Sequence, residues 1–180
     1  MLDESPLVSI EKLRVEFETN DGVVVGVKDV SFDIKPGECV CVVGESGSGK
    51  SVSSLSLMRL VEFGGGTITN GKLMFDTGDG KVVDLVRQST PVMRDIRGNQ
   101  IGMIFQEPMT ALNPVFTVGD QLAEGLIEHR GLDKKAARAR ALEILKQVRI
   151  PEPERRMDQY PHELSGGMRQ RVVIAIAMAC

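Results

Sequence analysis

The sequence has no hydrophobic run that is long enough to cross a membrane. Although 42% of its 180 residues are hydrophobic, no segment reaches the roughly 20 consecutive apolar residues of a membrane-spanning helix. Residues 1–11 also lack the basic start and apolar middle of a secretory signal peptide. We therefore expect a cytosolic protein, one that can still bind a membrane protein.

Cysteine is scarce, and its spacing excludes the common metal and disulfide patterns. The three cysteines, Cys39, Cys41 and Cys180, form neither a C-x-x-C pair nor a zinc-binding spacing. We expect Cys39 and Cys41 to be small buried residues on one face of a strand.

An excess of positive charge is missing as well. The formal net charge is −3, so nucleic acid is not expected as the main ligand. The basic residues at 134–140 are interpreted as a solvated helix face. The length fits one domain with a sizeable core.

The most informative segment is glycine-rich and spans residues 44–51, with the sequence Gly-Glu-Ser-Gly-Ser-Gly-Lys-Ser. Its glycines allow backbone conformations in which successive N–H groups point inward and hold an anion. Lys50 would reach the β- and γ-phosphates of a nucleotide, and the Ser51 hydroxyl would bind Mg²⁺. The predicted phosphate-binding residues are Gly44, Glu45, Ser46, Gly47, Ser48, Gly49, Lys50 and Ser51.

The flanks of this loop have the pattern that a phosphate-binding loop requires. Residues 39–43 are apolar and rich in valine, which predicts a buried strand of a parallel sheet. Residues 51–61 place Leu55 and Met58 on one face at helical spacing. A strand, this loop and a helix in succession predict an α/β fold of the P-loop type.

The residues before the loop indicate an antiparallel β-layer. Residues 8–18 alternate well enough for a strand, with a slip of phase at Glu11-Lys12, and residues 23–30 form a second strand after a strong turn signal at 20–22. A further turn at 35–38 leads into the predicted parallel strand.

After the first helix we expect a flexible link and two short strands. The link covers residues 64–70, and the strands cover 72–75 and 82–85 around a glycine-rich turn. A short helix is predicted to begin at Thr90-Pro91.

Residues 100–105 are predicted to be a buried strand that delivers Gln106 at its carboxyl end, where open α/β sheets meet their ligands. Two helices follow, the first capped by Thr117 and ended by Gly131, the second capped by Asp133. A last helix begins at Ser165, and the glycines at 166 and 167 allow a ligand to approach its first turn closely.

Together with the P-loop and Gln106, the string Leu-Ser-Gly-Gly at 164–167 closely resembles the ABC ATPase family, in which it is the signature motif. The fuller strings QEPMTALNP at 106–114 and YPHELSGGMRQR at 160–171 resemble the subfamily that powers bacterial import of dipeptides, oligopeptides, nickel or glutathione. The resemblance runs from about Val8 to Cys180. It implies a cytoplasmic subunit that is bound to a permease, and indirectly to a solute-binding protein, at the inner face of the plasma membrane. The loop at 107–114 and the helix from Thr117 are expected to face that permease, through residues that include Met109, Leu112 and Phe116.

The resemblance also implies roles for individual residues. Residues 44–51 match the Walker A motif, which holds ATP and Mg²⁺, and Gln106 matches the Q-loop glutamine that senses Mg²⁺ and the attacking water. Phe17 is the candidate aromatic for stacking on adenine, although it fits an ordinary core position equally well. The signature residues, which contact ATP held by a second ABC ATPase domain, would be Ser165, Gly166, Gly167 and Gln170.

Family members continue after the signature helix into a Walker B strand, a catalytic glutamate and a switch histidine. The sequence ends at Cys180, and its histidines, His129 and His162, lie elsewhere. We therefore expect these residues to be the first two-thirds of an importer ATPase, able to bind nucleotide weakly and to hydrolyse little of it. The expected division is 1–105 for the β-layer and P-loop core, 106–164 for the Q-loop and helical subdomain, and 165–180 for the signature helix.

Two alternatives stay open at this point. One is a non-transport ABC ATPase of DNA repair, although the coiled coil or zinc insertion usual in such proteins is not seen between the motifs. The other is a nucleotide-binding module that never hydrolyses ATP.

Overall fold

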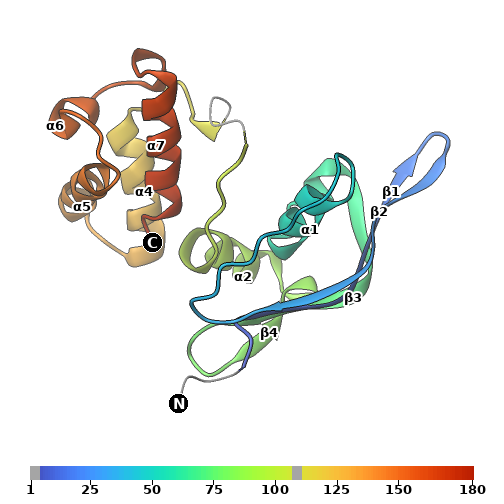
Figure 1. The fold of residues 1–180 in the computed structure, drawn as a ribbon. Helices are drawn as coiled ribbons and strands as arrows, with labels where there is room; N and C mark the ends of the chain where they lie inside the picture. The colour runs from blue at the N-terminus through green and yellow to red at the C-terminus, as the bar shows by residue number, and fades with distance from the viewer. Residues whose placement is uncertain (1–4, 107–110) are drawn as a thin grey trace. The chain divides into compact units, whose positions relative to one another are not determined.

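A computed structural model describes residues 5–106 and 111–180 of the chain. The chain forms two compact units, Met1–Met93 and Arg94–Cys180. Figure 1 shows the sheet and α1 in the first unit and the helices α4 to α7 in the second. In the described ranges no helix is both long and apolar enough to cross a membrane.

The first unit is built on a four-stranded antiparallel sheet with the order β2-β1-β3-β4. Its strands are β1 (Val8–Thr19), β2 (Gly22–Ile34), β3 (Gly66–Asp76) and β4 (Val82–Asp84). The strands predicted for residues 8–18, 23–30, 72–75 and 82–85 and the turn at 20–22 are confirmed, and Thr19 pairs with Gly22 across that turn. The predicted slip of phase is a bulge between Ile10 and Leu13, at which Lys12 has a φ of 48°.

The flexible link predicted for residues 64–70 is wrong for most of its length, because β3 begins at Gly66. Gly66 pairs with Phe17, and Ile68 pairs with Val15, both on β1. The pairing partner lies some 50 residues away in the chain, so the glycine-rich composition gave no local sign of the strand.

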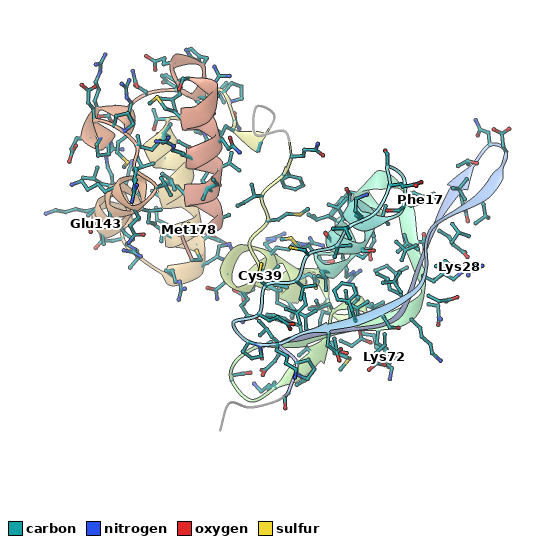
Figure 2. The ribbon with its side chains drawn as sticks, viewed as in Figure 1. Phe17, Lys28, Cys39, Lys72, Glu143 and Met178 are labelled. Carbon is teal, nitrogen blue, oxygen red and sulfur yellow. The ribbon has the colours of Figure 1, made fainter. Side chains whose placement is uncertain are left out.

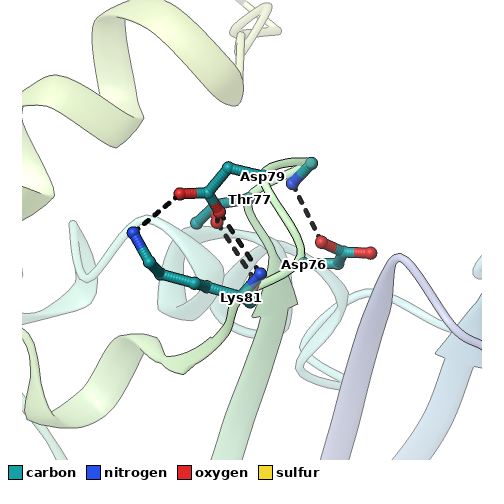
Figure 3. A network of polar contacts seen from close by, with 5 residues as sticks. Asp76, Thr77, Asp79 and Lys81 are labelled. Atoms are coloured by element: carbon teal, nitrogen blue, oxygen red, sulfur yellow. Dashed lines mark hydrogen bonds and ion pairs between the residues drawn. The ribbon is translucent and has the colours of Figure 1, made fainter.

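The turn between β3 and β4 is closed by a polar network (Figure 3). Asp76 accepts a hydrogen bond from the Gly78 N–H at 2.9 Å, Asp79 accepts from the Thr77 hydroxyl, and the Lys81 ammonium lies 2.9 Å from the other Asp79 oxygen. The Thr77 hydrogen bond and the Lys81 contacts lower the pKa of Asp79 from 3.8 to about 2. The glycine-rich turn is therefore ordered by its side chains.

The remaining elements of the first unit are α1 (Lys50–Leu57), the 3-10 turns η1 (Val61–Gly64) and η2 (Leu85–Arg87), and most of α2 (Thr90–Asp95). A methyl group of Val52 on α1 would meet a Cβ added at Gly26 on β2 at 3.7 Å, so α1 packs against the sheet. The largest fully buried side chains in this unit are Ile10, Leu13, Val15, Leu73, Leu85 and Met93.

Two predicted parallel strands are not formed. Residues 39–43 have no strand structure, Cys39 and Cys41 are exposed, and the Val43 side chain is 87% exposed, so the prediction of a buried strand is wrong. Residues 100–105 are likewise not a strand, and Ile104 and Phe105 are exposed. A parallel strand requires a neighbour to receive its hydrogen bonds, and all pairings among the described residues are antiparallel and involve other segments.

The second unit is helical. After a π-helical turn, η3 (Ile96–Gln100), it contains α4 (Val118–Arg130), α5 (Lys134–Gln147), α6 (Pro153–Arg156), η4 (Pro161–Glu163) and α7 (Gly166–Ala177). The predicted caps are confirmed, since the side chains of Thr117, Asp133 and Ser165 accept from the first turns of α4, α5 and α7. Gly131 ends α4 with a φ of 63°.

Only part of the apolar surface of α7 is buried. Val172, Val173 and Ala175 are buried in a core shared with α4 and α5, whereas Ile176 and Met178 are 37% and 56% exposed. The apolar surface at the end of α7 and at the following Met178 is therefore partly exposed.

Candidate functional site

The glycine-rich loop leads directly into α1. Gly47 and Gly49 have φ values of 81° and 90°, in the left-handed region that favours glycine. Within the loop, the Ser48 N–H donates to the Glu45 carbonyl at 3.3 Å, and a Cβ at Gly44 would lie 2.7 Å from the Ser48 hydroxyl oxygen. The loop is therefore a tight turn on which larger residues at these glycines would be strained.

Lys50 is folded back over this loop. Its ammonium donates to the carbonyl oxygens of Gly44 at 2.8 Å and Glu45 at 2.5 Å, and lies 3.3 Å from the Ser48 hydroxyl. Because Lys50 is also the first residue of α1, its positive charge lies beside backbone N–H groups that have no partner within the helix. No acidic residue occupies the first turn of α1. The arrangement concentrates positive potential where a phosphate could bind.

A neighbouring strand holds the end of the loop. A Cβ at Gly49 would lie 2.6 Å from the Gly26 carbonyl oxygen and 3.3 Å from a Val27 methyl group, both on β2. No sequence pattern points to Gly26, because it reaches the P-loop only through the folding of β2 into the sheet. The loop is thus held against the sheet on one side and exposed over residues 44–48 on the other.

Ser51 and its surroundings fit a magnesium ion that also binds phosphates and water. The Ser51 residue is exposed at the start of α1, directly after Lys50. No group of three or more His, Cys, Asp or Glu side chains suitable for a metal occurs within 5–106 or 111–180. A single hydroxyl ligand is consistent with Mg²⁺, which commonly keeps several waters and takes its other ligands from a nucleotide.

Phe17 lies on β1 close to the P-loop (Figure 2). Its ring atoms would meet a Cβ at Gly26 at 2.6 Å and a Cβ at Gly66 at 2.8 Å, so the ring packs on two bare backbone positions. Gly26 in turn touches Gly49 through its carbonyl oxygen. The half-buried ring therefore contacts Gly26, which in turn contacts the P-loop at Gly49. The ring also packs against the sheet.

Gln106 belongs to the second unit and is exposed. It follows residues 101–105, which have no regular secondary structure, instead of the predicted strand. Residues 107–110 lie outside the described residues, which includes Met109, one of three residues predicted to face a permease. Of the other two, Phe116 is 52% exposed, but Leu112 is 5% exposed and lies in the core with α4, so its predicted surface role is wrong.

The signature segment starts α7. The Ser165 hydroxyl accepts from the Met168 N–H at 3.4 Å, and its carbonyl accepts from the Arg169 N–H at 3.0 Å. Gly166 and Gly167 are exposed with nothing within 4 Å of an added Cβ, and Gln170 is exposed one turn later. The helix start therefore presents a free surface that a second molecule could approach.

A family model for ABC transporters matches residues 27–180. The chain belongs to the ABC transporter family. This ABC chain is 52% identical to the glutathione import ATP-binding protein GsiA of Pectobacterium atrosepticum over 180 residues, which is all of this chain and 29% of that protein. It is 51% identical to the dipeptide transport ATP-binding protein DppD of Bacillus subtilis over 174 residues, 97% of this chain and 50% of that protein. It thus spans half or less of the length of these two relatives.

Solved ABC cassettes have the same fold. The dimeric bacterial ABC transporter cassette MJ0796 matches with a TM-score of 0.81 and 30% sequence identity, over 96% of this chain and 69% of that one. A second structure of that cassette is a dimeric post-hydrolysis state bound to ADP and Pi, and it matches equally well. The predicted fold class, an α/β ABC ATPase cassette with an antiparallel sheet and helices, is confirmed.

Proposed function

We propose that the protein is the ATP-binding subunit of an ABC importer that takes up peptides or a similar small solute. The observation that carries the proposal is Lys50, held across a glycine-rich loop at the start of α1 by the Gly44 and Glu45 carbonyls. The importer class is supported by relatives that are named for glutathione import and dipeptide transport and are about half identical over this chain.

In this proposal the loop holds the phosphates of ATP. The backbone N–H groups of residues 44–51 and the Lys50 ammonium bind the phosphate oxygens and neutralise their charge. The Ser51 hydroxyl is a ligand of Mg²⁺, with Gln106 contributing when the site is complete. Phe17 stacks on the adenine from its place on β1.

The complete site forms between two ABC ATPase domains, identical or paralogous. Ser165, Gly166, Gly167 and Gln170 contact the nucleotide held on the second domain, because the start of α7 is exposed and free of bulky side chains. The subunit works at the cytoplasmic face of the inner membrane. There Phe116 and the neighbouring exposed Val115 face the permease, and a solute-binding protein delivers the cargo.

For residues 1–180 by themselves we propose nucleotide binding with little hydrolysis. This part of the proposal is supported by the sequence, in which no apolar segment ending in an acidic pair follows the signature within residues 1–180. Steady phosphate release from purified residues 1–180 that is abolished by Lys50→Ala would overturn this part of the proposal.

The transport function is tested in vesicles that contain the assembled transporter. ATP-dependent uptake of a labelled dipeptide or glutathione should occur with the wild-type subunit and fall to background with Lys50→Ala. Salt-sensitive DNA binding with no uptake of either solute would point to the non-transport class instead.

A further inference from the structure

The first turn of α4 is docked onto another segment of the second unit. The Val118 N–H donates to the Gln159 carbonyl at 2.9 Å, and the Gly119 N–H donates to the Met157 carbonyl at 2.9 Å. The third N–H of the helix, from Asp120, donates to the Thr117 hydroxyl at 3.2 Å. The first N–H groups of a helix have no acceptor within the helix. Here those of Val118 and Gly119 bond to segment 157–159, which fixes the helix start to that segment.

The same turn of α4 also holds the loop before it. The Gln121 side chain accepts from the Asn113 N–H at 2.9 Å, and its amide donates to the carbonyls of Asn113 at 2.9 Å and Phe116 at 3.0 Å. Three hydrogen bonds from one side chain close the loop at 113–116. This loop carries the exposed Val115 and Phe116 side chains.

From segment 157–159 the chain reaches the signature through a stiff turn. The Tyr160 N–H donates to the Glu163 carboxylate at 2.7 Å, the Glu163 N–H donates back to the Tyr160 carbonyl at 3.0 Å, and the turn contains Pro161. The Arg169 guanidinium then donates to the Leu164 carbonyl at 3.0 Å. Each step from Gln159 to Ser165 is therefore constrained by a backbone or side-chain contact.

The docking depends on the absence of a side chain at position 119. A Cβ there would lie 2.7 Å from the terminal methyl group of Met157 and 2.8 Å from the Met157 carbonyl oxygen, which is itself the acceptor of the Gly119 N–H. Arg138 supports the junction from α5 by pairing with Asp158 and lying 3.9 Å from Asp120. Gly119 is buried, so the clash cannot be relieved into solvent.

We propose that the first turn of α4 and segment 157–159 form a joint that fixes the position of the signature loop, with Gly119 as its positioning residue. The docking of α4 on segment 157–159 rests on the hydrogen bonds and the close approach described above. Its effect on ATP turnover rests on the proposed function, because it assumes that Ser165 contacts nucleotide on a second domain.

The joint is tested by hydrogen–deuterium exchange on Gly119→Ala, with Gly125→Ala as the matched control. Both glycines are in α4, but a Cβ at Gly125 has nothing within 4 Å. Gly119→Ala should speed exchange of the amides at 118 and 119 about tenfold, the effect of losing one hydrogen bond, and should also speed exchange at 163–168. Unchanged exchange at 163–168 in a variant with faster exchange at 118 and 119 would overturn the proposal.

A second readout separates the joint from general destabilisation. In the full assembled transporter, Gly119→Ala should lower the ATP turnover number about tenfold and leave the ATP dissociation constant at the P-loop unchanged. A wild-type protein that binds no ATP would refute the proposed function, whereas the exchange result would still decide the joint.

If Gly119→Ala does not fold, Arg138→Met tests the same junction. Its side chain is 39% exposed, so the change should be tolerated, and it removes the ties to Asp120 and Asp158. Exchange at 118–119 and 163–168 should rise together. A rise at one segment without the other would overturn the proposal.

Discussion

Gly49 at the end of the P-loop lies against Gly26 on β2, so closely that a Cβ on Gly49 would be 2.6 Å from the Gly26 carbonyl oxygen. The phosphate cradle is therefore seated on the antiparallel sheet as well as on α1. The two glycines are 23 positions apart in the sequence, so the contact cannot be predicted from the residues around either one.

Substitution of Gly49 should be far more damaging than substitution of Gly47. Both have positive φ, so alanine costs about 1–2 kcal/mol at either position. At Gly49 the backbone clash with Gly26 should add about 1–3 kcal/mol, whereas a Cβ at Gly47 meets nothing within 4 Å. Urea unfolding of Gly49→Ala and Gly47→Ala measures the difference, and equal free energies of unfolding would contradict the seating of the loop on β2.

Phe17 can be tested for stacking apart from packing. Phe17→Leu keeps most of the apolar contact with Gly26 and Gly66 but removes the aromatic face, so it should weaken ATP binding by about 1 kcal/mol. Affinity for inorganic triphosphate, which has no base, should stay the same. If both affinities fall equally, or neither changes, Phe17 acts only as a core residue.

The sequence predicted best those features that are set by local chemistry. The turn at 20–22, the bulge near Lys12 and the caps at Thr117, Asp133 and Ser165 all depend on residues within a few positions of each other. Such features do not depend on contacts with residues that are distant in the sequence.

Strands and contacts that form between residues remote in the sequence are predicted less well. Residues 39–43 have the composition of a buried strand, but composition cannot show whether neighbouring strands are present to pair with it. In the same way, the composition around Gly66 is typical of a link, because its pairing partner Phe17 is remote in sequence. The closeness of Gly26 to Gly49 and of Gly119 to Met157 also depends on tertiary contacts between residues remote in sequence, and no sequence pattern points to it.

Acid should weaken the turn between β3 and β4 in a defined range. Hydrogen bonding from Thr77 and the Lys81 contacts lower the pKa of Asp79 from 3.8 to about 2, so its carboxylate form favours the folded state. That contribution should be fully present above about pH 4 and lost as the pH falls from about 4 to 2. Thermal unfolding of Asp79→Asn and wild type should therefore differ most above pH 4.

The cause of that shift can be checked by NMR titration of the Asp79 carboxyl group. Thr77→Val should raise the pKa toward the ordinary value, because the Thr77 hydrogen bond is the largest cause, and Lys81→Met should raise it as well. A pKa that stays near 2 in both variants would show that the network in Figure 3 does not set it.

Equilibrium binding of ATP, followed by calorimetry with and without Mg²⁺, tests the central claim most directly. The account predicts saturable binding to the wild-type protein that is stronger with Mg²⁺ and is lost in Lys50→Ala, because the ammonium now held by the Gly44 and Glu45 carbonyls supplies the charge at the phosphate site. Ser51→Ala should retain binding but lose the effect of Mg²⁺. Equal binding by wild type and Lys50→Ala would contradict the account.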